Sequence, residues 1–149
     1  MFKMQIEGKI IEGIVLGFLC LCAVFDISRK EIPMILINIG FAAAFFVNVW
    51  GVMNGTISFI EIGLCLIPGI FFALVGLCTR ENVGFGDGLI LLVMGLFIGF
   101  YRCFFVLCIS LIFSSVFALI LLLLRRAGKE SRIPFAPFLA IGMGVGLFV

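Results

Sequence analysis

Long stretches of apolar residues limit what this chain can fold into. From Cys103 to Leu124 no residue carries a charge, and several other stretches are nearly as long. A helix needs about 20 apolar residues to cross the hydrocarbon core of a bilayer. Charged residues make up 12% of the chain, about half of the roughly 25% that is usual in soluble domains. The sequence therefore predicts an integral membrane protein.

The apolar stretches predict an all-α membrane protein in which one domain, residues 1–149, forms a bundle of six transmembrane helices. We expect these helices at residues 8–25, 34–53, 58–78, 88–101, 103–124 and 133–149. A break is needed near Gly99–Arg102, because a single helix from 88 to 124 would measure roughly 55 Å, far more than a bilayer requires. Ile32-Pro33 and Ile133-Pro134 open two of the stretches, and proline is well tolerated in a first helical turn.

The basic residues predict the orientation of the chain in the membrane. Six spans put most lysines and arginines on one face: Arg29, Lys30, Arg80, Arg125, Arg126, Lys129 and Arg132. The other face holds Lys3, Lys9 and Arg102. The positive-inside rule places the more basic face in the cytoplasm, so both termini are expected outside. The net charge of +2 is too small to suggest nucleic-acid binding.

The chain contains only two aspartates, Asp26 and Asp87, and each stands where an apolar stretch meets a short polar loop. Both fall on the predicted cytoplasmic face, and a charge at a membrane boundary is a functional candidate by default. Two carboxyl groups held close together share one proton. Such a pair can hydrolyse a peptide bond, because the ionised group takes a proton from the attacking water while its partner protonates the developing oxyanion or the leaving amine. We interpret Asp26 and Asp87 as a catalytic pair.

Three glycines, Gly84, Gly86 and Gly88, surround Asp87 and predict a turn free of side-chain bulk. Such a turn could lie against an extended substrate backbone. Structural interpretations exist for both acids, since Asp87 could cap the following helix and Asp26 could be an interfacial anchor. From the residues alone, a transporter or ion pathway is a serious alternative, because acids inside membranes mark those proteins too.

The remaining polar residues give little sign of other chemistry. The chain has no histidine and its six cysteines form no C-x-x-C pair, so metal sites of the Cys/His kind and histidine-based catalysis are not expected. We interpret the cysteines as packing residues. On the outer face, we expect Glu61 to pair with Arg102, since an unpaired charge there would have to reach water.

Three motifs resemble the type IV prepilin peptidases, which are membrane aspartic proteases of the G-x-G-D type. Asp26 is followed by Ile32-Pro33, as in the D-x5-I-P pattern of that family, and residues 84–87 match G-x-G-D. Residues 133–140, IPFAPFLA, look like the family segment I-P-F-G-P-F-L-A. The resemblance covers roughly residues 20–140. It implies that Asp26 and Asp87 are the catalytic residues, that Pro134 and Pro137 shape the last loop near the site, and that no metal or cofactor takes part.

The resemblance also implies a substrate and a place in the cell. The substrate would be a prepilin or pilin-like protein of a type IV pilus or protein-secretion system. It would be held in the cell membrane by its hydrophobic N-terminal helix and lose a short leader at the cytoplasmic face. The sequence shows no paired C-x-x-C motifs of an N-methyltransferase region. We therefore expect the short form that cleaves without methylating, as found with Tad-type pili, competence pseudopili or archaeal-like systems.

Three positions depart from the family pattern. Met34 replaces the usual asparagine, Ala136 replaces the usual glycine, and Leu89 replaces a lysine that would put a cation near Asp87. These departures keep an alternative open, in which the chain is a small membrane transporter or a non-catalytic assembly component that retains the fold. An assembly component would tolerate Asp→Asn changes that abolish a protease. The sequence does not predict the oligomeric state.

Overall fold

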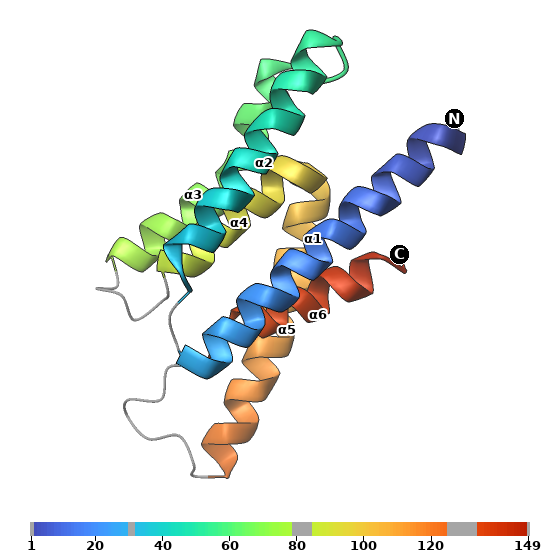
Figure 1. Ribbon diagram of the computed structural model, residues 1–149. Coiled ribbons are helices and arrows are strands. Elements are labelled where there is room, and N and C mark those ends of the chain that lie inside the picture. Colours follow the sequence, from blue (N-terminus) through green and yellow to red (C-terminus); the bar gives the residue numbers. More distant parts are fainter. Residues whose placement is uncertain (1, 30–31, 79–84, 125–133, 149) are drawn as a thin grey trace.

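The computed structural model describes residues 2–29, 32–78, 85–124 and 134–148. Over these ranges the chain forms helices and turns without any strand (Figure 1). The helices are α1 (Phe2–Arg29), α2 (Met34–Met53), α3 (Phe59–Cys78), α4 (Phe85–Ile98), α5 (Phe100–Leu123) and α6 (Ala136–Gly146). Four of them, α1, α2, α3 and α5, are long and apolar enough to cross a membrane. The all-α prediction is confirmed, and six membrane crossings stay a prediction, because α4 and α6 are shorter apolar helices.

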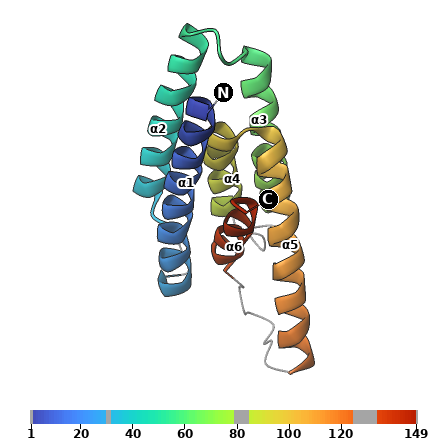
Figure 2. The same ribbon diagram turned by 90° about the vertical axis from the view of Figure 1, so that its right-hand side faces the viewer.

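Helix α4 lies at the centre of the bundle and packs against α1, α2, α3 and α5. The short α6 packs between α1 and α5 (Figure 2). The turn that joins α2 to α3 lies at the same end of the bundle as the N-terminus (Figure 1). Fully buried side chains from α1, α4, α5 and α6 fill the core, among them Leu19, Leu91, Met94, Val106 and Leu139. This core holds the end of α1, the start of α4 and the start of α6 against one another.

Glycines bring α3 and α4 unusually close together. A Cβ atom at Gly88 would lie 2.7 Å from the backbone N and Cα of Ala73, and one at Gly69 would meet Leu92 at 2.5 Å. A Cβ at Gly95 would collide with the carbonyl oxygen of Cys65. Small residues allow this approach between membrane helices, which gains van der Waals contact. The seam fixes the position of the first turn of α4.

The helix boundaries agree with the prediction in some places and differ in others. The predicted break falls at Gly99, whose φ of +83° is a backbone conformation that favours glycine. The expected turn around Asp87 was wrong, because Phe85–Gly88 form the first turn of α4, and Gly84 lies outside the described residues. Pro134 lies before α6 rather than in its first turn, and the proline inside that turn is Pro137.

The expected ion pair between Glu61 and Arg102 is also wrong. Arg102, in the first turn of α5, forms a salt bridge with Glu12 of α1. Glu12 is buried, whereas the side chain of Arg102 is largely exposed. The carboxylate of Glu61 instead accepts a hydrogen bond from the Ser58 N–H at the start of α3, over 2.8 Å. The salt bridge therefore ties α1 to the α4–α5 turn, far along α1 from Asp26.

Candidate active site

Asp26 lies in the last turn of α1 and is 9% exposed. Its Oδ2 atom accepts a hydrogen bond from the backbone N–H of Ala136 over 3.1 Å, and the backbone of Phe135 contributes a further hydrogen bond. Cys22 is one turn earlier on the same face of α1 and is completely buried. The end of α1 thus carries its carboxyl group inward, onto the start of α6.

Asp87 lies in the first turn of α4 and is 8% exposed. Its carboxyl group is close enough to Asp26 for the two to interact electrostatically, and Cys22 interacts in the same way with both. The two aspartates of the chain, 61 positions apart in the sequence, therefore meet in one buried site. Two carboxyl groups that interact in a buried site disfavour the doubly ionised form, because each negative charge opposes the other.

The start of α6 forms the third side of the site. Phe135 is the N-cap residue and Ala136 the first helical residue, and both are buried. The ring of Phe135 stacks on Phe72 of α3, with ring centroids 5.4 Å apart and planes 17° from parallel. Pro134 and Pro137 stand on either side of these two residues. The segment that was expected to shape the site thus contacts Asp26 through its backbone, while the ring of Phe135 packs against α3.

The other predicted glycines contribute in different ways. A Cβ atom on Gly86 would meet Cδ1 of Ile32 at 3.5 Å, an ordinary contact, so the Ile-Pro motif after Asp26 lies against the G-x-G-D motif. Gly88 is required for the close approach to Ala73 described above. The three sequence motifs therefore converge at one end of the bundle. They lie between the end of α1 and the start of α2, at the start of α4, and at the start of α6.

The three departures from the family pattern stand in different relations to the carboxyl groups. Leu89 is two residues after Asp87, and at about 100° per residue its side chain points to the other side of α4. Met34 is exposed at the start of α2. Ala136 differs from the usual glycine by one methyl group, and its backbone N–H still donates a hydrogen bond to Asp26. The effect of residue 89 on the charge beside Asp87 stays a prediction.

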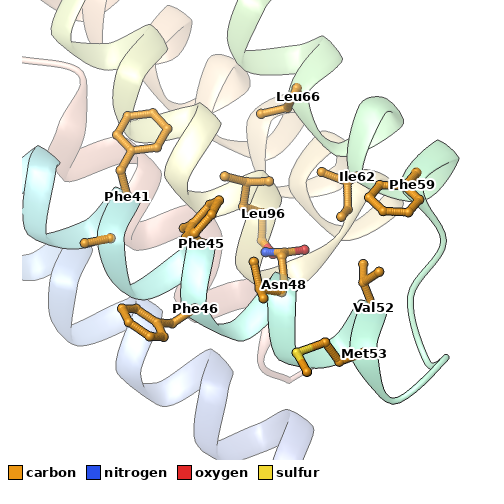
Figure 3. A pocket seen from close by; sticks show the side chains of 12 residues that line it. Phe41, Phe45, Phe46, Asn48, Val52, Met53, Phe59, Ile62, Leu66 and Leu96 are labelled. Atoms are coloured by element: carbon orange, nitrogen blue, oxygen red, sulfur yellow. The ribbon is translucent and has the colours of Figure 1, made fainter.

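An apolar pocket of about 730 Å³ opens between α2 and α3 (Figure 3). Its lining includes Phe45, Val52 and Phe59, together with Leu96 of α4. Its polar side chain, Asn48, donates hydrogen bonds to the carbonyl oxygens of Ala44 and Leu96 over 2.8 and 3.0 Å. Leu96 is nine residues after Asp87, which brings it to the opposite side of α4 at about 100° per residue. The pocket and the carboxyl pair are thus separate features.

Sequence reasoning missed the site residues that act through packing or backbone. Cys22 could have been found from its spacing, because residues four apart share a helix face. Phe72 and the Ala136 N–H have no local sequence signal, since both depend on how α3 and α6 pack. Within the described ranges, no group of three or more histidine, cysteine, aspartate or glutamate side chains could hold a metal ion.

Comparisons with a family model and with curated proteins indicate the same family. The model of the Type IV leader peptidase family matches residues 13–123. A prepilin leader peptidase/N-methyltransferase from Aeromonas salmonicida strain A449 is 31% identical over 85 residues, which are 57% of this chain and 29% of that protein. Its counterpart from Aeromonas hydrophila is 29% identical over the same shares. No solved structure matches significantly. The family match covers most of the chain, and the chain belongs to the Type IV leader peptidase family.

Proposed function

We propose that this protein is a membrane-embedded aspartic endopeptidase that removes the short leader of prepilin or pilin-like proteins. The observation that carries the proposal is the meeting of Asp26 and Asp87, from α1 and α4, in one buried site. Family membership supports a prepilin leader peptidase. The aligned part covers 29% of the relatives, so the activity of this chain rests on its own site.

A pair of carboxyl groups suffices for the reaction. One group is ionised and takes a proton from water while the water oxygen attacks the scissile carbonyl carbon. The other is protonated and gives its proton to the carbonyl oxygen, which removes the developing negative charge. Collapse of the resulting diol breaks the C–N bond as the amine receives a proton. The burial of both groups keeps bulk water from competing for these protons.

The position of the pair suits a substrate anchored in the membrane. Asp26 is three residues before the end of α1 and Asp87 is in the first turn of α4, so both lie at helix ends rather than at mid-span. The basic loops that follow α1 and α3 in the sequence give this end the cytoplasmic assignment under the positive-inside rule. A prepilin held by its hydrophobic helix would present its leader junction at this level, with both termini of the enzyme outside.

The proposal is tested by co-expressing the protein with a candidate prepilin from the same gene neighbourhood and following leader removal on a gel. The variants are Asp26→Asn and Asp87→Asn, with Glu61→Gln as a matched loss of one carboxylate in the α2–α3 turn region. We expect cleavage by the wild type and Glu61→Gln and by neither aspartate variant. Cleavage that persists in an Asp→Asn variant would remove that residue from the mechanism. Pilus assembly supported by both variants would favour a non-catalytic assembly component instead.

A further inference from the structure

The start of α6 offers a small and well-defined set of backbone donors. The first N–H groups of a helix have no partner inside the helix. Pro134 and Pro137 have no N–H, and the N–H groups of Phe138 and Leu139 donate to the carbonyl of Phe135 over 3.0 and 3.2 Å. The free donors are therefore those of Phe135 and Ala136, between the two prolines. Both interact with the carboxyl group of Asp26.

Both aspartates are buried residues, and they differ in the hydrogen-bond donors that the protein offers them. Among the residues that the structure describes, Asp87 has no hydrogen-bond donor, and the titratable groups within electrostatic reach of the pair are limited to Cys22. Asp87 lies in the first turn of α4, whose N-terminal end favours a negative charge, whereas Asp26 faces the start of α6 but also lies in the last turn of α1, whose C-terminal end opposes one. The direct N–H bonds to Asp26 act against this difference between the helix ends, because hydrogen bonds to a carboxylate favour its charged form and act at shorter range than a helix end does.

We infer that Asp26 carries the single negative charge of the pair and is the general base, that Asp87 is the protonated general acid, and that the Ala136 N–H is the positioning group that sets this order. The inference rests on the proposed function and assigns its two roles. Asp26 takes the proton of the attacking water, and Asp87 protonates the carbonyl oxygen. As the C–N bond breaks, Asp26 passes its proton to the amine, and the hydroxyl of the diol returns a proton to Asp87. Both groups end in their starting states.

The first test labels the carboxylate chemically in the purified full-length protein at neutral pH. A small epoxide reacts with an ionised carboxylate, whose oxygen attacks a ring carbon, while the opened ring oxygen takes a proton from water. Because the exposures of 9% for Asp26 and 8% for Asp87 are those of whole residues, the labelling is repeated across pH, and the pH at which each ester begins to form reports the charge of its carboxyl group independently of access. We expect mass spectrometry to find at least about tenfold more ester on Asp26. Equal labelling, or more on Asp87, overturns the assignment.

The second test removes the donor itself. Ala136→Pro deletes the N–H at the first helical position, where proline is accepted, and Ala136→Gly is the control that keeps it. If Asp26 is the base, the acid limb of the pH–rate profile for prepilin cleavage moves up by about one pH unit in Ala136→Pro, while the alkaline limb stays. If Asp87 were the base, the alkaline limb would move instead. Movement of that limb, or of neither, overturns the inference.

The two tests separate this inference from the proposed function. Phe135 has helical dihedral angles, φ −93° and ψ −28°, which a following proline disfavours. If the Ala136→Pro variant does not fold, the labelling experiment alone tests the assignment of the two roles. A wild type that cleaves no prepilin would contradict the proposed function and leave the labelling result valid. A wild type that cleaves prepilin but is esterified on Asp87 would contradict the role assignment alone.

Discussion

The seam between α3 and α4 makes Gly88→Ala a sensitive test of how Asp87 is held. The added methyl group would lie 2.7 Å from the N and Cα atoms of Ala73 and 2.8 Å from its Cβ. Carbon atoms rest at about 3.5–4.0 Å, so relief requires the two helices to part by roughly 1 Å. The clash involves backbone, which cannot rotate away as a flexible side chain can.

Two effects of opposite sign set the magnitude. Overpacking of this kind costs about 1–3 kcal/mol, and the backbone contact places it at the upper end. Alanine regains up to about 1 kcal/mol over glycine inside a helix. The net loss is about 2 kcal/mol, which lowers the Tm by roughly 6 °C in a chain of this size. Asp87 is the neighbouring residue, and a catalytic group displaced by about 1 Å loses on the order of a hundredfold in rate.

The assay compares Gly88→Ala with Gly17→Ala in the same detergent. Gly17 is exposed on α1, and an added Cβ meets nothing within 4 Å, so this control changes helix propensity alone. We expect Gly88→Ala to lower both the Tm and the rate of prepilin cleavage, and Gly17→Ala to leave both unchanged or to raise the Tm slightly. A Gly88→Ala protein with wild-type Tm and cleavage would refute the close approach of α3 and α4.

Two further perturbations test other contacts. Arg102→Met should lower stability by roughly 1–3 kcal/mol and by more than Glu12→Gln does, because it leaves the buried carboxylate of Glu12 unpaired. The double variant should recover part of the loss in thermal unfolding, and equal single losses with no recovery would contradict the pair. Asn48→Leu should cost about 1 kcal/mol through its lost hydrogen bonds yet keep prepilin cleavage, because it lies across α4 from the carboxyl pair. A large loss of cleavage at unchanged Tm would connect that pocket to the site after all.

Local physics made part of this fold predictable. The range of α2 coincides with the prediction, 34–53, because a proline precedes it and the apolar length fits one crossing. The break before α5 was predicted from an over-long apolar stretch, and it falls on Gly99 with its positive φ. Both features depend on residues near one another in the sequence, which is why a single sequence suffices for them.

The errors concern neighbours that the sequence does not specify. Glycine-rich composition around Asp87 indicated a turn, whereas Gly88 lies within a helix, where its lack of a side chain permits close packing against Ala73. Arg102 forms its salt bridge with Glu12 and not with the predicted partner Glu61, because the sequence could not tell which helix lies beside the start of α5. Counting the spans predicts which membrane face a residue lies near. Which residue it pairs with depends on how the helices pack, and six apolar helices can pack in many arrangements.

The start of α6 was predictable in part from the sequence and in part only from the packing of the helices. Its prolines were visible in the sequence and were interpreted as loop-shaping residues, but only the fold shows that they isolate two N–H groups beside Asp26. A backbone donor survives every side-chain substitution except proline. This explains why alanine can stand at position 136, where the resemblance predicts glycine, without loss of the contact. The hydrogen bond to Asp26 requires a backbone N–H at position 136 but no particular side chain. Alanine in place of the glycine of the motif is therefore compatible with an intact site.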